Sequence, residues 1–267
     1  MAILPEISGP DDVKRLDAKQ LDELAAELRQ TIIDTVSRQG GHLASNLGDV
    51  ELTIALHRAF NSPTDKLVFD VGHQIYAHKL LTGRQEQFKT LRSYHGMSGF
   101  PCREESEHDL FDTGHSSTSI SMALGLARAR DLNHEDYHVV AIVGDGALTG
   151  GMALEALNDA GVWKEGVRLL VILNDNDCSI SPPAGALSNH LAKIVSTRAY
   201  TCAREISKRV LKPVPGLWDI AKRMEKQAIN FVSPPSGIFS SFDLNYYGPV
   251  DGHDVVGLVE VLKNLRR

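Results

Sequence analysis

The chain is poor in cysteine, in long apolar runs and in positive charge. Only three of its 267 residues are cysteines, and they form no Cys-x-x-Cys pair: Cys102, Cys178 and Cys202. This count argues against a disulfide framework and favours a reducing compartment. No apolar run approaches the roughly 20 residues that cross a bilayer, the first residues lack the apolar core of a signal peptide, and the net charge is −6. We therefore expect a cytoplasmic protein that binds neither membranes nor nucleic acid.

Zinc-binding patterns are also missing. The eleven histidines include no His-Glu-x-x-His pattern and no cluster with cysteines at zinc-ligand spacing. A histidine taken alone is therefore more often a surface or core residue than a catalyst. Hydrophobic residues at 42% and charged residues at 23% are ordinary for a globular protein, and the length suffices for one large domain or two small ones.

Apolar periodicity predicts an α/β fold with a doubly wound, mostly parallel sheet flanked by helices. Short apolar runs at 66–69, 139–143 and 169–173 indicate strands that are covered on both faces. Helical periodicity falls between and around them, over 17–40, 50–60, 119–129, 152–160 and 255–265. The alternation of strands and helices along the chain is typical of a parallel sheet.

A different pattern occupies residues from about 183 to 243. Prolines interrupt the modest helical stretches there, and the segment contains no convincing strand. We interpret it as a helical or mobile insertion into the domain rather than as an independent domain. Residues 246–250 are a candidate for a further strand of the sheet.

Polar residues follow two of the predicted strands. Asp145 stands between two glycines directly after the run 139–143, and the run 169–173 is followed by Asn-Asp-Asn-Asp at 174–177. Because ligands of open parallel sheets bind beyond the carboxyl ends of the strands, Asp145 and Asn176 can meet at that edge. A carboxylate and an amide oxygen together suit Mg²⁺. The alternative is a pair of polar turns in which Asp145 is merely solvated.

Six motifs along the chain resemble one enzyme family. They are GGHLASNLG (40–48), DVGHQ (70–74), TGHSSTSIS (113–121), GDGALTGGMALEALN (144–158), ILNDNDCSIS (172–181) and YGPVDGHD (247–254). In this order they resemble the 1-deoxy-D-xylulose-5-phosphate synthase family, whose members depend on thiamine diphosphate and are related to transketolases. The resemblance implies a thiamine-diphosphate-binding fold with Mg²⁺ and thiamine diphosphate as cofactors.

The resemblance also implies roles for individual residues. The Mg²⁺ ligands would be the side chains of Asp145 and Asn176 and the carbonyl of Cys178. Gly146 and Ala147 would approach the diphosphate. A second cofactor-contacting turn, where a helix start offers free N–H groups to an anion, would be formed by Gly114, His115 and Ser116. His73 would lie near the diphosphate and the thiazolium ring, and His42 would face the substrate and assist proton transfer.

The resemblance covers only the first part of the family's length. Residues 1–267 would form the diphosphate- and metal-binding domain, and the chain lacks the pyrimidine-binding and C-terminal domains. The pyrimidine-binding domain supplies the glutamate that contacts the cofactor's aminopyrimidine ring, so we expect this chain to be inactive alone. The complete enzyme would condense pyruvate with glyceraldehyde 3-phosphate and release CO₂, a step in isoprenoid, thiamine and pyridoxal synthesis. We expect a homodimer, a partner chain carrying the pyrimidine-binding domain, or both.

Two alternatives to this interpretation remain open on the sequence. The chain could be the N-terminal subunit of a split transketolase. It could also be a module that binds a cofactor or a partner without catalysis.

Overall fold

The computed structural model describes residues 2–163, 167–175 and 236–266. The chain divides into two compact units. The first comprises Met1–Leu157, Glu165–Asn176 and Asp251–Arg267, and the second comprises Asn158–Lys164 and Asp177–Val250. Two predicted site residues, Asn176 and Cys178, and nearly all of the insertion predicted at about 183–243 lie outside the described residues.

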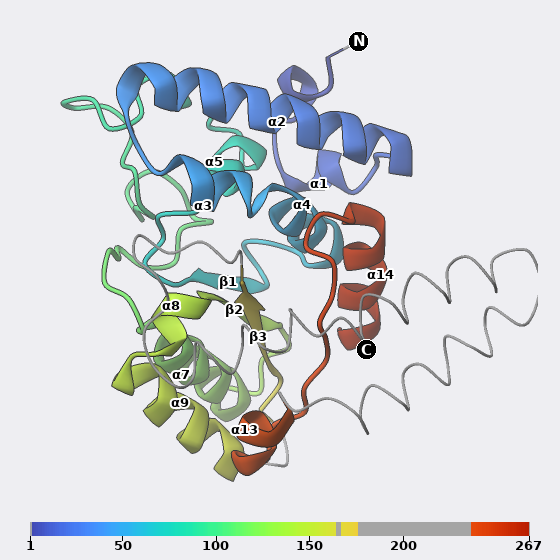
Figure 1. Ribbon diagram of the computed structural model, residues 1–267, viewed down its shortest axis with the longest axis vertical. Helices are drawn as coiled ribbons and strands as arrows, with labels where there is room; N and C mark the ends of the chain where they lie inside the picture. The colour runs from blue at the N-terminus through green and yellow to red at the C-terminus, as the bar shows by residue number, and fades with distance from the viewer. Residues whose placement is uncertain (1, 164–166, 176–235, 267) are drawn as a thin grey trace, which may run out of the picture. The chain divides into compact units, whose positions relative to one another are not determined.

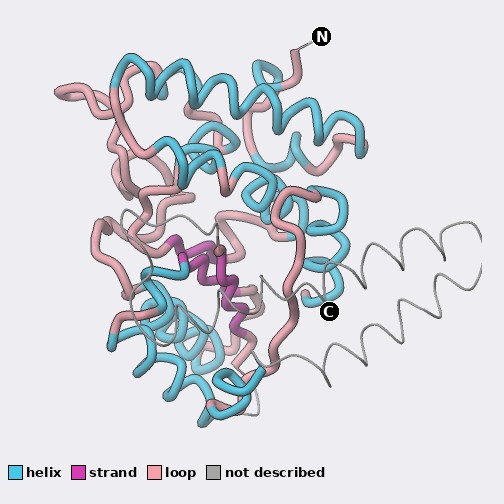
Figure 2. Tube along the Cα trace, viewed as in Figure 1, coloured by secondary structure: helices cyan, strands magenta, loops and turns pink. Residues whose placement is uncertain are grey.

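A parallel sheet of three described strands forms the centre of the first unit, as predicted (Figure 2). The strands lie in chain order: β1 (Lys66–Phe69), β2 (Val139–Gly144) and β3 (Leu169–Asn174). In their register, Phe69 pairs with Ile142 and Gly144 pairs with Asn174. The carboxyl ends of all three strands therefore lie at one edge of the sheet.

Helices cover both faces of this sheet (Figure 1). On one face, Leu67, Phe69, Val140 and Ile142 belong to the same buried cluster as apolar side chains of helices α2 (Ala18–Gln39), α4 (Val50–Ala59), α5 (Tyr76–Leu81) and α14 (Val255–Leu265). Strand side chains alternate between the faces, so Val68 and Ala141 point to the other side, where α7 (Ser119–Leu132) packs on β1 and β2. This arrangement confirms the doubly wound α/β fold.

The long helix α2 begins and ends at the residues that the sequence indicates. Asp17 and Gln20 form a capping box, in which each side chain accepts a 2.9 Å hydrogen bond from the other residue's backbone N–H. The helix ends at Gly40, whose φ of +75° favours glycine. The shorter described helices of this unit are η1 (Leu4–Glu6), α1 (Pro10–Val13), α3 (Leu43–Leu47), α6 (Gln85–Phe88) and α8 (Asp145–Leu148). Helix α9 (Gly151–Val162) begins in the first unit and ends in the second.

The described part of the second unit corrects one expectation. It contains α13 (Ser236–Ser241), and the Phe239 and Tyr246 rings stack 5.5 Å apart. Residues 246–250 do not form a strand. Gly248 has a φ of +152° and Pro249 has no backbone N–H to donate to a ladder, so the extended run cannot join a sheet. None of the helices in the described ranges has the length and apolar character needed to cross a membrane.

Candidate active site

The carboxyl edge of the sheet brings the predicted motifs together. Asp70–His73 follow β1, Gly144–Ala147 stand at the end of β2, and Asn174 ends β3. The turn 114–118 precedes α7, the helix that packs on β1 and β2. Four of the six motifs therefore contribute residues to this edge, where open parallel sheets bind their ligands.

Asp70 and Ser117 join two of these turns. The buried Asp70 carboxylate accepts hydrogen bonds from the backbone N–H groups of Ser117 (2.8 Å) and Ser119 (3.0 Å). The Ser117 hydroxyl donates to the carbonyl of Ala147 at 2.7 Å. The 114–116 turn is thereby held beside the Gly146–Ala147 turn. Sequence reasoning places Asp70 after a strand and Ser117 at the start of a helix, inside the recognised motifs, but assigns neither residue a role in the site.

The two joined turns leave polar groups accessible. Gly114, His115, Ser116 and Gly146 are exposed, and a β-carbon on either glycine would meet no atom within 4 Å. Backbone N–H groups in open, glycine-containing turns suit an anionic ligand, because the ligand can approach them closely. By contrast, a β-carbon on Gly150 would lie 2.0 Å from the Ser117 hydroxyl, so glycine is required at that position.

Asp145 supplies a carboxylate beside these turns. It is the first residue of α8, it is partly exposed, and its carboxylate makes no hydrogen bond or ion pair within the described ranges. A carboxylate without a cationic partner at the edge of a parallel sheet fits a Mg²⁺ ligand. The described residues contain no group of three or more His, Cys, Asp or Glu side chains that could hold a metal. Because Asn176 and Cys178 are outside those residues, the three-ligand set stays a prediction.

His42 and His73 lie next to each other. Their ring centroids are 5.4 Å apart and the ring planes are inclined by 73°. Burial lowers the pKa of His42 and of His73; the charge of Arg92 lowers that of His42 further, and a proton on His42 would lower that of His73. Both imidazoles are therefore uncharged at neutral pH. Both residues are partly exposed, and their Nδ1 atoms are buried without a hydrogen-bond partner in the part of the chain that is described.

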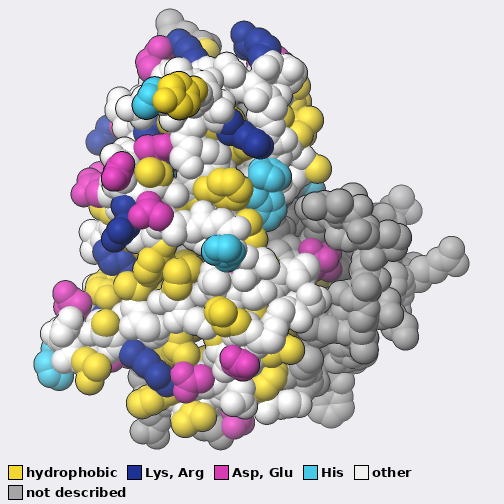
Figure 3. Space-filling model, turned by 90° about the vertical axis from the view of Figure 1, so that its left-hand side faces the viewer, with side chains coloured by type: hydrophobic (Ala, Val, Ile, Leu, Met, Phe, Trp, Pro, Cys, Tyr) yellow, Lys and Arg dark blue, Asp and Glu magenta, His cyan; other side chains and the backbone are white. Residues whose placement is uncertain are grey.

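An open groove lies between the 98–104 segment and the 112–115 turn. It has a volume of about 490 Å³, and its lining includes Phe100, Pro101, Gly114 and His115. The Phe100 ring also contacts His42, with ring centroids 5.8 Å apart. Figure 3 shows histidine side chains exposed among hydrophobic and acidic ones on one face of the molecule. The groove is large enough for a small organic ligand beside the predicted cofactor turn.

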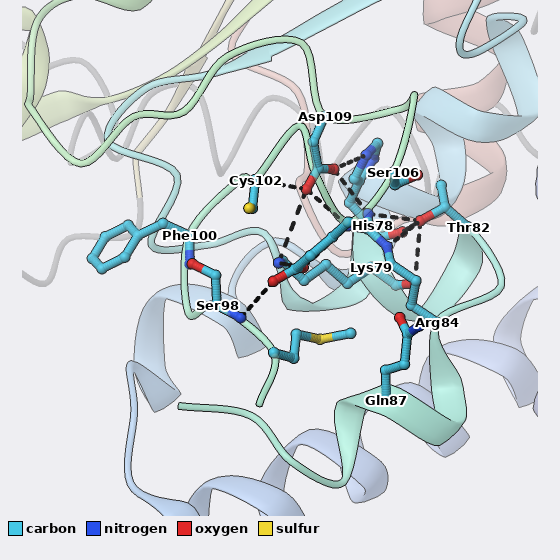
Figure 4. Close-up of polar contacts among 12 residues, drawn as sticks. His78, Lys79, Thr82, Arg84, Gln87, Ser98, Phe100, Cys102, Ser106 and Asp109 are labelled. Carbon is cyan, nitrogen blue, oxygen red and sulfur yellow. Dashed lines mark hydrogen bonds and ion pairs between the residues drawn. The ribbon is translucent and has the colours of Figure 1, made fainter. Parts of the chain in front are cut away.

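A buried ionic network holds the segment that carries Phe100 (Figure 4). Arg84 donates two 2.8 Å hydrogen bonds to the Asp109 carboxylate, which also accepts from the Cys102 N–H at 2.9 Å. Lys79, fully buried, donates to Glu105 at 2.5 Å, and Glu105 accepts from the Ser98 N–H at 2.6 Å. In Figure 4 the Phe100 ring points away from this network. The network thus fixes both ends of the loop whose aromatic ring packs on His42.

Asn174, the first asparagine of the Asn-Asp-Asn-Asp run, has a structural partner. Its side-chain amide donates to Asp49 at 3.1 Å, and the other Asp49 oxygen accepts from the Thr53 hydroxyl at 3.1 Å. Asp49 is fully buried, and burial raises its pKa to about 8. The end of β3 is therefore tied to α4 through a carboxyl group that keeps its proton at neutral pH.

Replacing Asp49 by asparagine is expected to change the pH dependence of stability. An unfolded aspartate loses its proton near pH 3.8, whereas the folded one holds it to about pH 8. The stability contributed by Asp49 therefore falls as the pH rises through this window, by about 1.4 kcal/mol per pH unit. The asparagine keeps the shape and does not titrate; its oxygen can accept from Asn174, and its amide can donate to the Thr53 hydroxyl. Urea unfolding at pH 5 and pH 8 gives the free energy of unfolding of the variant and the parent. The difference should shift in favour of the variant from pH 5 to pH 8. An equal difference at both pH values would contradict the assignment.

Comparison with known proteins identifies the family. A family model described as 1-deoxy-D-xylulose-5-phosphate synthase matches residues 4–267. Curated proteins of that name from Burkholderia orbicola (strain MC0-3) and Leptothrix cholodnii are 54% and 55% identical over 264 and 266 residues, which is 99% of this chain in both cases. The chain spans only 41% and 42% of the length of these relatives.

A solved structure gives the same fold. A mutant transketolase from Pichia stipitis superimposes with a TM-score of 0.64 at 18% identity, covering 94% of this chain and 35% of the transketolase chain. At that identity the likeness concerns the fold, which is the thiamine-diphosphate-binding α/β fold. The sequence matches are the stronger finding, because they reach 54% and 55% identity over nearly the whole chain. The chain belongs to the 1-deoxy-D-xylulose-5-phosphate synthase family and corresponds to the N-terminal domain of its members.

Proposed function

We propose that this chain supplies the diphosphate- and metal-binding half of a 1-deoxy-D-xylulose-5-phosphate synthase active site. The complete enzyme would condense pyruvate with glyceraldehyde 3-phosphate, release CO₂ and feed isoprenoid, thiamine and pyridoxal synthesis. One observation carries the proposal most directly. Ser117 and Asp70 hold the Gly114–Ser116 turn beside the Gly146–Ala147 turn at the carboxyl edge of the sheet. These are the two turns that the family resemblance assigns to the diphosphate.

The residues at this edge fit thiamine diphosphate and Mg²⁺. Asp145 is a carboxylate without a partner among the described residues, and the exposed glycines offer open backbone to an anion. The metal would be held by the Asp145 and Asn176 side chains and the Cys178 carbonyl, and the diphosphate by Gly146, Ala147, Gly114, His115, Ser116 and His73. When bound, the cofactor supplies the electron sink for cleaving and forming carbon–carbon bonds.

The two neighbouring histidines would handle protons near the substrate. Because burial lowers the pKa of His42 and of His73, each imidazole has an uncharged nitrogen able to accept a hydrogen bond or a proton near neutral pH. His42 would face the substrate, and His73 would contact the cofactor.

The chain would need a second polypeptide region for turnover. In this family a glutamate of the pyrimidine-binding domain contacts the cofactor's aminopyrimidine ring, whereas residues 4–267 match the family's N-terminal part. We propose a homodimer, a separate chain carrying the pyrimidine-binding domain, or both, in a cytoplasmic setting. The identity of more than 50% to synthases over the whole chain favours this function over a subunit of a split transketolase.

The proposed function predicts no turnover by the chain alone. The purified chain should bind thiamine diphosphate weakly with Mg²⁺ and should release no CO₂ from pyruvate. Adding the remaining C-terminal part of the Leptothrix cholodnii relative as a separate polypeptide should restore both CO₂ release and deoxyxylulose phosphate formation. The C-terminal part alone serves as the control. Robust synthesis by this chain alone, or no activity in the mixture despite complex formation, would contradict the proposal.

A further inference from the structure

Asn46 connects the two segments that carry His42 and His73. It is fully buried, and its side-chain amide donates to the carbonyl of His42 at 2.5 Å and to the carbonyl of His73 at 2.8 Å. Its side-chain oxygen accepts from the backbone N–H of Tyr76 at 2.9 Å. The amide nitrogen and the oxygen of the Asn46 side chain are therefore both hydrogen-bonded to backbone groups.

We propose that Asn46 is a positioning residue that sets the geometry of the His42–His73 pair. The inference rests on the proposed function, which places both histidines in the active site. Asn46 has no polar atom left for a ligand, so it acts only through the segments it holds. His42 immediately precedes α3, and His73 follows β1 in the segment that leads into α5. The Asn46 side chain therefore sets the position of the segment before α3 relative to the segment between β1 and α5.

The chemistry of the asparagine side chain explains why this residue type is required. A planar amide has two N–H donors on one side and one acceptor on the other, on a stem of a single methylene group. Aspartate has the same shape but would place an acceptor against two carbonyl oxygens. Alanine would leave the carbonyls of His42 and His73 without this donor, which removes the link between the two segments.

The surroundings of the histidine pair depend on the same link. The backbone N–H of Tyr76 donates to Asn46. The Tyr76 hydroxyl accepts from the backbone N–H of His42 at 3.3 Å. Arg92 lies on the His42 side, and Asp70 lies on the His73 side, where its charge raises the pKa of His73 against burial and His42. Loosening the link should admit water to both rings and separate them, so both pKa values should return toward the ordinary value.

The test uses the whole chain without any ligand, so its outcome does not depend on turnover. Histidine ring signals are followed by NMR across a pH titration in the parent and in Asn46→Ala and Asn46→Ser variants. Both His42 and His73 should show higher pKa values in Asn46→Ala than in the parent, and the nuclear Overhauser contact between their rings should weaken. The serine variant keeps one donor and should show a smaller change.

Asp65→Asn provides the matched control. Asp65 is also buried and also bridges two backbone segments, accepting from the N–H groups of Asn61 at 2.7 Å and His138 at 2.8 Å. It precedes β1, at the opposite end of the strand from His73. This variant should lower stability while leaving the titrations of His42 and His73 unchanged.

With the C-terminal part added, Asn46→Ala should lower kcat more than it raises KM.

Three results would overturn the inference. One is an unchanged pair of histidine titrations and ring contacts in a folded Asn46→Ala variant. Another is an equal shift of both titrations in Asp65→Asn, which would indicate general loosening. The third is failure of both Asn46 variants to fold, which would assign the residue to folding itself. If the titrations shift as expected but the mixture with the C-terminal part stays inactive, the proposed function fails while the positioning role stands.

Discussion

Replacing Asp145 by alanine is expected to abolish Mg²⁺-dependent binding of thiamine diphosphate to this chain. The carboxylate is the single charged protein ligand in the proposed set, and it makes no competing contact within the described residues. Loss of a residue that only supports a metal ligand typically costs 10- to 100-fold in affinity, so loss of this direct ligand should cost more than about 100-fold. Calorimetry of thiamine diphosphate binding, with and without Mg²⁺, measures the effect.

The control for this prediction is Asp136→Ala. Asp136 is an exposed aspartate just before β2, at the opposite edge of the sheet, and it pairs with Arg168 at 2.6 Å. The substitution changes the net charge by the same amount without touching the proposed site. It should leave diphosphate binding intact. Unchanged affinity in Asp145→Ala, or an equal loss in both variants, would remove Asp145 from the metal site.

Replacing Asp109 by alanine is expected to destabilise the fold by about 3–5 kcal/mol. The carboxylate is completely buried and compensates the buried charge of Arg84 through two hydrogen bonds of 2.8 Å. Burial alone would raise the pKa of Asp109, but contacts with His78 and Arg84 hold that pKa well below its usual value. Removing the acid leaves the guanidinium in the interior without its partner. Urea unfolding at pH 7 measures the loss.

Two comparisons define the cause of that loss. Asp112→Ala removes an exposed acid three residues away, paired with Arg103, and should have little effect. Because the folded Asp109 has a lowered pKa, its contribution is complete above about pH 4 and falls as the pH drops below that value, so the gap between variant and parent should narrow in acid. An equal loss in Asp112→Ala, or a loss independent of pH, would mean that the charge pairing is not responsible.

Replacing Asp109 by alanine should also affect the candidate active site. Asp109 accepts from the Cys102 N–H and thereby anchors the loop that places Phe100 against His42. We expect this ring contact to loosen in Asp109→Ala, even under conditions where the protein stays folded.

The sequence by itself determined the elements and the chemistry at the strand ends. Strands and helices follow from local periodicity, which depends on neighbouring residues only: the run 139–143 is apolar throughout because both faces of β2 are covered. Asp145 could be placed at the ligand-binding edge because parallel strands all end on the same side. The six motifs then identified the family, which the comparisons confirm.

Only the tertiary structure decided which polar side chains hold these parts together. Asn46 with the His73 carbonyl, Asp49 with Asn174, and Asp70 with Ser117 are pairs 27, 125 and 47 residues apart. A buried polar residue can be recognised as a partner only when the chain is folded, because hydrogen bonding depends on ångström-scale placement, not on periodicity. The strand expected at 246–250 is wrong for a different reason: Gly248 has a φ of +152° and Pro249 has no backbone N–H, so this run does not form a strand.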